Sequence, residues 1–294
     1  MAILVDGNTR LLVQGITGRA GTFYTNLAIE HGAKVVAGVR PGKGGSRHLS
    51  LPVFDNVAEA MHETGANASV IFVPAPQAGA AIIEAVEAEV PLVICVTERV
   101  PTLDMVKARQ ALEGSATKLV GPNSQGVLSP GKCKVGVMST ADARPGSIGI
   151  VSRSASLTSE IVAQTSAAGL GQSTTVGIGA DPVHGIGFVD CLRLLMDDNE
   201  TEGVILIGEI GGNEEEAAAD YLRQEGPRKP VVALVAGRHA PPERRMGHAG
   251  AFTSFGQGSA AAKVEALRSA GARIAENADL VAQTMRQALL EKAA

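Results

Sequence analysis

One histidine between small residues has the clearest potential for chemistry in this sequence. His248 lies in RRMGHAGA (residues 244–251), where glycine and alanine leave space beside the imidazole for a bulky group. An imidazole nitrogen is a competent nucleophile near neutral pH. The chain has six histidines, and a lone histidine is more often structural or solvated, as we expect for His31 and His62 at helix ends. We therefore take His248 as the candidate nucleophile.

Glu209 is the carboxylate that the sequence places best to support this histidine. It lies in GEIGG (208–212), after a predicted strand over residues 204–207. A carboxylate fixes the tautomer of a nucleophilic histidine and steadies the charged adduct. The sequence has no HxxxH or HExxH motif and no cysteine that would support a metal site at His248. It also has no G-x-S-x-G motif, which a serine hydrolase of this type would need. Phosphoryl transfer to the histidine is the remaining interpretation.

A serine-rich helix start, SRSAS (152–156), follows a predicted strand over residues 148–151. Its hydroxyls, backbone N–H groups and one cation favour an oxyanion or phosphate cradle facing the histidine. The alternative is a serine N-cap without a ligand. The helix predicted from Asn213 begins with three glutamates, and this negative first turn makes it a poor phosphate site.

A glycine-rich loop, G-x-x-G-x-x-G over residues 15–21, joins the first predicted strand to a helix. Glycines let the backbone approach a phosphate, and the N–H groups of a helix start favour its charge; a tight turn without a ligand is the alternative. The second strand is followed by RPGKGG (40–45), with two cations and no carboxylate. An NAD site usually has an acid there, so a phosphorylated ribose is favoured, as in NADP or coenzyme A.

Two further strand ends point to the same pocket. VPAP (73–76) suits the wall of a nucleotide pocket, or simply a rigid turn. In VTE (96–98), Thr97 and Glu98 are able to hydrogen-bond a pantetheine amide or an adenine, or else to cap the next helix.

Short apolar runs of strand length alternate with helical stretches along the whole chain, which predicts an α/β fold with parallel, doubly wound sheets. A turn-rich stretch, GPNSQG (121–126), separates two such series. We place a domain boundary there and expect domains over residues 1–126 and 127–294, the second of flavodoxin-like type.

Composition excludes several classes of function. A net charge of −4 and 3% aromatic residues disfavour nucleic acid as a partner, and no apolar run approaches the length of a membrane span. Three widely separated cysteines without a CxxC pair argue against a disulfide framework or a zinc site. The first six residues lack the features of a secretory signal, so we expect a cytoplasmic location.

The motifs together resemble the α subunit of succinyl-CoA synthetase and its relatives, the ADP-forming acyl-CoA ligases. The resemblance covers nearly the whole chain, and its motifs occur in the order of that family: GITGRAGTF, RPGKGG, VPAP, CVTE, GPN, SRSASLT, VGIGADP, LIGEIGG and RRMGHAGA. It implies a Rossmann-like coenzyme A-binding domain followed by a flavodoxin-like ligase domain that carries a phosphohistidine.

The resemblance also implies a reaction and its residues. A carboxylate is activated by ATP or GTP to an acyl phosphate, the phosphate passes through a histidine, and coenzyme A forms the thioester. His248 and Glu209 match the phosphorylated histidine and its carboxylate partner. The cofactor is expected at Thr17, Gly18, Arg19, Ala20, Lys43, Val96, Thr97 and Glu98, and substrate or phosphate at Asn123, Ser154, Ala155 and Ser159.

A partner subunit follows from the same resemblance. The chain has no G-x-x-x-x-G-K-[ST] loop to hold a nucleotide. In the family, ATP or GTP with Mg²⁺ binds to a β subunit with an ATP-grasp fold, which implies an αβ or (αβ)2 assembly. The substrate is a small dicarboxylic acid, with succinate expected first.

Several residues depart from the family's pattern, and they bear on the substrate. Ser159 stands where succinate-using members generally carry a tyrosine, and Tyr24 stands in place of a histidine. Ser124-Gln125 replaces a Cys-Pro pair, and Ala155 replaces a glycine. The run over residues 252–258 also departs from the family's pattern. The loss of a tyrosine opens space, so malate or another substituted dicarboxylate is the alternative substrate.

Two classes of protein without ligase activity stay open. An NADP-dependent dehydrogenase explains the glycine loop and Lys43 but leaves GEIGG and GHAGA without a role. A non-catalytic coenzyme A-binding protein keeps the first domain and has no need of His248.

Overall fold

The computed structural model describes residues 2–241, 244–253 and 258–293. Its contacts divide the chain into two compact units, of which one comprises Leu4–Met138 with Val183–Gly185. The other contains Ser139–Pro182 and the chain from Ile186 onward. The units alternate along the chain and do not meet at one position, so the domain boundary after residue 126 stays a prediction.

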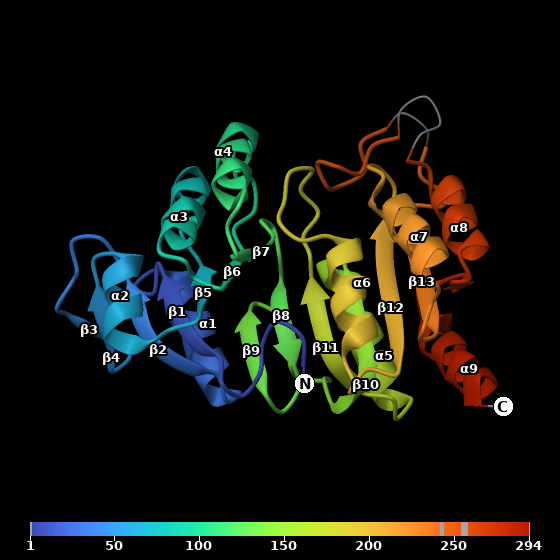
Figure 1. Ribbon diagram of the computed structural model, residues 1–294, viewed down its shortest axis with the longest axis horizontal. Coiled ribbons are helices and arrows are strands. Elements are labelled where there is room, and N and C mark those ends of the chain that lie inside the picture. The colour runs from blue at the N-terminus through green and yellow to red at the C-terminus, as the bar shows by residue number, and fades with distance from the viewer. Residues whose placement is uncertain (1, 242–243, 254–257, 294) are drawn as a thin grey trace. The chain divides into compact units, whose positions relative to one another are not determined.

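The first unit is built on a twisted sheet with strand order β3-β4-β2-β1-β5-β6-β7 (Figure 1). Its neighbouring strands are parallel except for the antiparallel pair β3 and β4. The parallel strands, numbered in chain order, therefore lie as 3-2-1-4-5-6, which is the Rossmann order. The strands are β1 (Arg10–Gln14), β2 (Lys34–Val39), β3 (Arg47–His48), β4 (Leu51–Phe54), β5 (Ala68–Ile71), β6 (Leu92–Cys95) and β7 (Lys118–Val120).

Helices cover both faces of this sheet. Helices α2, α3 and α4 contact one another in series and form one layer, whereas α1 packs on β1 and β2 and on the antiparallel hairpin β8–β9. Because both faces are covered, β5 and β6 are buried throughout, as their apolar sequences require. The elements are α1 (Arg19–Glu30), α2 (Val57–Thr64), α3 (Ala75–Glu87), α4 (Thr102–Leu112), β8 (Gly126–Ser129) and β9 (Cys133–Gly136).

The second unit contains five parallel strands in the order β14-β13-β12-β10-β11. Numbered in chain order and read from the β11 edge, this is 2-1-3-4-5, the flavodoxin-like order that the sequence predicts. Helices α6, α7 and α8 contact one another in series on one side, and α5 contacts α9 on the other (Figure 1). The strands are β10 (Pro145–Ser152), β11 (Gln172–Gly177), β12 (Gly203–Glu209), β13 (Val231–Ala236) and β14 (Arg273–Ile274). The helices are α5 (Ala155–Ala167), α6 (Phe188–Asp197), α7 (Glu214–Glu225), α8 (Ala260–Ser269), the 3₁₀ helix η1 (Ala278–Leu280) and α9 (Val281–Ala293).

The predicted α/β class is confirmed, and the differences concern short strands. β3, β4, β8, β9 and β14 are each two to four residues long and are absent from the prediction. Each forms by pairing with a neighbour, so its own sequence gives little periodic signal.

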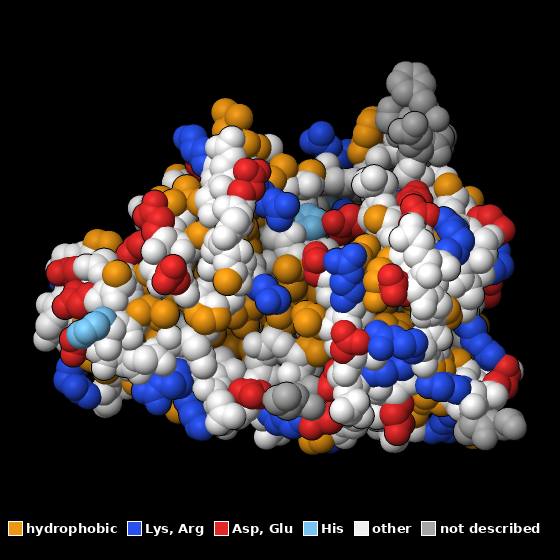
Figure 2. Space-filling model, in the orientation of Figure 1, with side chains coloured by type: hydrophobic (Ala, Val, Ile, Leu, Met, Phe, Trp, Pro, Cys, Tyr) orange, Lys and Arg blue, Asp and Glu red, His pale blue; other side chains and the backbone are white. Residues whose placement is uncertain are grey.

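Charged side chains of both signs are interspersed over the face shown in Figure 2. Within the described ranges, no helix combines the length and the apolar character needed to cross a membrane.

The turn between β1 and α1 depends on close backbone packing. Gly15 has a φ of +81°, and a Cβ added at Gly21 would lie 2.2 Å from the carbonyl oxygen of Gly15. The third glycine of the loop thus lets α1 begin directly against the strand end.

We expect Gly21→Ala to lower the free energy of unfolding by about 2 kcal/mol, because the methyl group forces the turn away from the helix. Gly7→Ala is the matched control, since a Cβ there meets nothing within 4 Å. Urea unfolding of both variants measures the difference. Equal midpoints for the two would contradict this account of the turn.

Candidate active site

The strand order of the second unit brings two chemically important loops together. The order reverses between β10 and β12, which pair in parallel with Ser152 beside Ile207. Ligands of open α/β sheets bind at the carboxyl ends of the strands, at such a switch point. Arg153 follows β10 and Glu209 ends β12, so both side chains start from this edge.

His248 reaches the same edge from the loop after β13. Its Nδ1 lies 2.7 Å from Oε2 of Glu209. A carboxylate only accepts hydrogen bonds, so Nδ1 carries a proton, and in the neutral imidazole Nε2 keeps its lone pair. The His248 side chain is 38% exposed and that of Glu209 only 9%, which leaves the imidazole accessible above a buried carboxylate.

Glycine at position 211 admits the histidine loop. A Cβ added at Gly211 would lie 1.8 Å from the carbonyl oxygen of Gly250, and its φ is +87°. The loop is closed by backbone hydrogen bonds from Ala251 to His248 and from Met246 to Ala251. The motifs GEIGG and GHAGA therefore pack directly on each other where Gly211 meets Gly250.

Glu209 raises the pKa of His248 above its usual value, chiefly through their hydrogen bond. Burial acts in the opposite direction, the charge of Glu209 adds to the increase, Arg153 lowers the pKa, and Asp181 raises it. The carboxylate of Glu209 thus favours the protonated form of the imidazole, and the cation of Arg153 opposes it.

A cluster of buried charges lies behind Glu209. Arg153 contacts Glu209 and Glu215, and Lys263 contacts Glu215. The first turn of α7 carries three glutamates, which make it a poor phosphate site, as the sequence predicts. Glu215, from that turn, is buried and paired with two cations.

The start of α5 has the cap that the alternative interpretation describes. The Ser154 side chain accepts a hydrogen bond from the Leu157 N–H at 3.3 Å. No acidic residue occupies the first turn, and Ala155 and Ser156 are exposed. Ser159, one turn later, is exposed and donates to the carbonyl of Ala155 at 3.3 Å. Three predicted substrate or phosphate residues, Ser154, Ala155 and Ser159, therefore share one helix start.

A cavity of about 700 Å³ lies at the switch point of the first unit, between the ends of β1 and β5. Gly18, Arg19 and Ala20, three of the predicted cofactor residues, line it together with Arg40. No side chain caps the α1 N-terminus and no acid occupies its first turn. The cavity thus combines a helix N-terminus with two cations, which suits a phosphorylated ligand. Its other lining residues include Gln14, Gln77, Ala80 and Glu84, which the sequence did not single out.

The other predicted cofactor residues do not line this cavity. Thr17 accepts a hydrogen bond from Arg40 at 3.4 Å, so it lies beside a lining residue. Lys43 is exposed, and its N–H donates to Asp55, whose pKa is lowered chiefly by the hydrogen bond from Gly44.

The segment after β6 also lies beside the cavity wall. The Thr97 hydroxyl donates to the carbonyl of Val73, a lining residue, at 2.7 Å. The Asn123 N–H donates to the carbonyl of Thr97 at 2.9 Å, which joins Asn123 to this group. Val96 is half-buried and Glu98 exposed.

Tyr24, one of the departures from the family's pattern, packs against Phe72 and Lys134 of the first unit. Its ring stacks on Phe72, a lining residue of the cavity, with centroids 5.7 Å apart. Lys134 Nζ lies 5.7 Å from the Tyr24 ring centroid, and burial lowers the pKa of Lys134 to about 8. The tyrosine therefore joins the cavity wall to a buried lysine.

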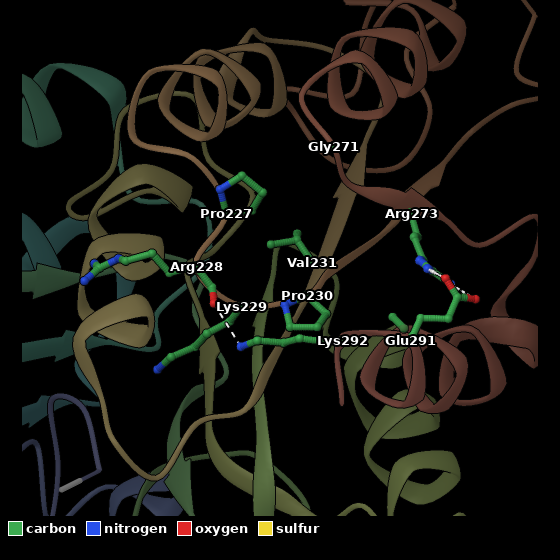
Figure 3. A pocket seen from close by; sticks show the side chains of 10 residues that line it. Pro227, Arg228, Lys229, Pro230, Val231, Gly271, Arg273, Glu291 and Lys292 are labelled. Carbon is green, nitrogen blue, oxygen red and sulfur yellow. Dashed lines mark hydrogen bonds and ion pairs between the residues drawn. The ribbon is translucent and has the colours of Figure 1, made fainter. Parts of the chain in front are cut away.

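A smaller pocket of about 340 Å³ lies near the start of β13 (Figure 3). It contains four basic side chains, but each has a partner in the second unit. These are Arg228 with Asp197, Arg273 with Glu291, Lys229 with the carbonyls of Leu195 and Asp198, and Lys292 with the carbonyl of Arg228. We therefore do not take it as the candidate site.

The residues that the structure describes form no cluster of three or more His, Cys, Asp or Glu side chains suited to a metal ion. Cys95, Cys133 and Cys191 are buried and form no disulfide. Burial raises the pKa of the Cys133 thiol to about 11.

We expect Glu209→Gln to lower the pKa of His248, because the amide removes the charge and the charge-assisted hydrogen bond that raise it. The wild-type pair stabilises the fold below the unfolded-state pKa of histidine, and this stability is lost as the pH rises through the raised folded-state pKa. The loss of stability in the variant should therefore be larger at acidic pH than above that range.

An NMR titration of His248 in the full chain, with unfolding at acidic and alkaline pH, tests this expectation. Glu63→Gln is the matched control, because Glu63 faces the exposed His62. An unchanged His248 titration in Glu209→Gln would rule out the coupling.

Comparison of the sequence with known proteins shows which family the chain belongs to. Residues 6–99 match the model of the CoA binding domain, and residues 151–273 match that of the CoA-ligase family. The chain is 50% identical to the succinate–CoA ligase (ADP-forming) alpha subunit 2 of Archaeoglobus fulgidus, over 97% of this chain and 100% of that protein. It is 47% identical to the alpha subunit of Staphylococcus aureus succinate–CoA ligase (ADP-forming), over 99% and 96% of the two chains.

Solved structures agree on the fold. An ATP citrate lyase from Methanothrix soehngenii, in complex with citrate and coenzyme A, has a TM-score of 0.87 and 25% identity over 99% of this chain. A dinucleotide-forming acetyl-coenzyme A synthetase from Ca. Korarchaeum cryptofilum has a TM-score of 0.76 and 17% identity over 94% of this chain, which shows a shared fold. The chain spans 52% and 60% of those longer chains. By its sequence identity over nearly its full length, the chain belongs to the family of succinate–CoA ligase (ADP-forming) alpha subunits.

Proposed function

We propose that this protein is the α subunit of a nucleotide-dependent acid–CoA ligase that forms a dicarboxylyl-CoA thioester, with succinate as the first substrate to test. The observation that carries the proposal is the 2.7 Å contact between His248 Nδ1 and Glu209 Oε2, in a chain about half identical to succinate–CoA ligase α subunits. A protein that only binds coenzyme A or NADP has no need of this pair.

The cavity of the first unit fits coenzyme A. Gly18, Arg19 and Ala20 would hold phosphate oxygens at the start of α1, with Arg40 as a further cation. Thr17, Lys43 and residues 96–98 would lie around the rest of the cofactor. Coenzyme A supplies the thiol that accepts the acyl group.

His248 carries the phosphoryl group in this proposal. In the direction of thioester formation, Nε2 takes the γ-phosphoryl group of the nucleotide: the N–P bond forms as the bond from phosphorus to the oxygen of the leaving nucleoside diphosphate breaks. A carboxylate oxygen of the acid then attacks the same phosphorus, and the electron pair of the N–P bond returns to Nε2. The coenzyme A thiol, with loss of its proton, displaces inorganic phosphate from the acyl phosphate and forms the thioester. Glu209 holds the Nδ1 proton throughout and compensates positive charge on the ring. The N–H groups at the start of α5 suit the phosphoryl oxygens, because an anion is stabilised at a helix N-terminus.

A β subunit completes the enzyme. The relatives in this family are named as alpha subunits, and this chain has no P-loop motif. We propose that an ATP-grasp β subunit binds ATP or GTP with Mg²⁺, that the two chains form an αβ or (αβ)2 assembly, and that the enzyme acts in the cytoplasm.

We expect the chain, purified with its β subunit and given ATP labelled at the γ position, to acquire an acid-labile phosphate on the His248 peptide. His248→Asn should lose the label and turnover while it keeps coenzyme A binding. His239→Asn is the matched control, because His239 is exposed in the same connection between β13 and α8.

Discharge of the label by one acid with coenzyme A identifies the substrate. A competent complex in which His248 never carries label would overturn the proposal. Binding of NADP would then favour a dehydrogenase, and binding of coenzyme A alone would favour a non-catalytic protein.

Malate, or another substituted dicarboxylate, is the second candidate substrate. Ser159 is short and exposed at the start of α5, where succinate-using members generally carry a tyrosine. The related ATP citrate lyase was solved with citrate, a hydroxylated acid, which shows that such an acid is compatible with that relative. The smaller side chain leaves space for an added hydroxyl.

We expect Ser159→Tyr to raise the ratio of kcat/KM for succinate over malate by about tenfold, since one contact in a pocket discriminates at this level. Ser159→Phe fills similar space without the hydroxyl and separates size from hydrogen bonding. Initial rates with both acids measure the ratio. If the tyrosine variant keeps the wild-type ratio, Ser159 does not select the acid.

A further inference from the structure

Four buried charged side chains form a continuous cluster beneath His248. The exposed fractions of the side chains are 9% for Glu209, 6% for Arg153, 2% for Glu215 and zero for Lys263. Two carboxylates face two cations, so the buried cluster is balanced in charge while the imidazole is neutral. Glu216, which is 31% exposed, lies 3.7 Å from Lys263 at its edge.

Arg153 is the cation that faces Glu209. Its Nη2 lies 3.5 Å from Oε1 of Glu209, and its Nη1 lies 3.3 Å from Oε1 of Glu215. Oε1 of Glu209 is buried and accepts no hydrogen bond from the residues that the structure describes. The two oxygens of this carboxylate therefore have different partners: Arg153 for Oε1 and His248 for Oε2.

Glu215 and Lys263 hold the guanidinium in place. The Gly211 carbonyl accepts from Arg153 at 3.2 Å and from Lys263 at 2.7 Å. Lys263 also contacts the second oxygen of Glu215. Oε1 of Glu215 accepts from the Glu209 backbone N–H at 3.0 Å, so the backbone of the catalytic carboxylate is fixed by the same group. Arg153 is thus held by Glu215 and by the Gly211 carbonyl.

We propose that Arg153 is a positioning residue for His248: its guanidinium fork, anchored by Glu215 and Gly211, engages Oε1 of Glu209 and directs Oε2 to the imidazole Nδ1–H. Nε2 is then the nitrogen that meets the phosphoryl group. This last step rests on the proposed function, whereas the tautomer and the carboxylate orientation do not.

The charge of Arg153 has a second effect on the same imidazole. The groups that act on His248 are Glu209 at the end of β12, Arg153 after β10 and Asp181 in the segment after β11. Arg153 lowers the pKa of His248, in opposition to both carboxylates. Its removal should therefore raise the pKa and leave less neutral, nucleophilic imidazole near neutral pH.

The test uses the full chain labelled with ¹⁵N-histidine, with His248→Asn to assign the signal. Long-range ¹H–¹⁵N spectra report which ring nitrogen carries the proton, and a pH series reports the titration. We expect the Nδ1–H tautomer in the wild type. In Arg153→Met we expect a mixture of tautomers and a titration midpoint moved to higher pH.

Arg153→Lys separates the fork from the charge. Lysine keeps a cation but cannot bridge two carboxylates with planar geometry, so we expect a titration closer to the wild type with a mixed tautomer. Arg228→Met, in the exposed pair with Asp197, is the matched control for loss of one arginine. It should leave both readouts unchanged.

In the complex with the β subunit, labelling of His248 at neutral pH should fall about tenfold in Arg153→Met, with the acid limb of its pH profile moved to higher pH. A uniform loss at every pH with an unchanged tautomer would indicate a merely structural role and overturn the proposal. If Arg153→Met does not fold, Arg153→Lys decides: wild-type tautomer and labelling in that variant would overturn it.

The two proposals fail in different ways. If His248 is never labelled in the wild-type complex, the proposed function fails. The tautomer and titration of His248 in the chain alone still decide whether Arg153 orients Glu209.

Discussion

The hydrogen bond between His248 and Glu209 is the interaction on which the rest of the site depends. It fixes the proton on Nδ1 and leaves Nε2 accessible. The bond requires the end of β12 to lie beside a loop that follows β13, and Gly211 is needed where that loop meets the strand end. The carboxylate must also stay buried and charged, which the cations behind it allow. The strand order, the loop glycine and the buried cations therefore all contribute to the contact between His248 and Glu209.

Both units use the same topological device for different chemistry. Among the parallel strands of each unit the order reverses once, and the important loops follow the strands at or next to this reversal. The first unit places glycines and cations there, which suits a phosphorylated cofactor. The second places Arg153, Glu209 and the histidine loop there, which suits transfer of a phosphoryl group. The fold decides where a ligand meets the sheet, and the loop residues decide which chemistry follows.

Sequence patterns predicted the alternating elements, the flavodoxin-like order and the pairing of His248 with Glu209, because these depend on local apolar runs and on strand ends. They could not predict the Lys263–Glu215 pair. Lys263 lies in α8 and Glu215 in α7, and the charges in each helix are typical of a solvated face. Only the packing of α7 on α8 buries both. Asp55, which accepts hydrogen bonds from the loop around Lys43, was missed for a different reason: the contact joins residues twelve positions apart through the short strands β3 and β4, which the sequence did not predict.

Stability alone gives no reason for four buried charges at this position. A buried ion pair gains little over well-packed apolar residues, because desolvation offsets much of the attraction. Such a cluster does give orientation, since each carboxylate oxygen has a separate partner. It also balances opposing effects: Glu209 favours the protonated imidazole, whereas burial and Arg153 favour the neutral one. A nucleophilic histidine needs both, because the carboxylate must orient the ring without holding it in the charged form that cannot attack.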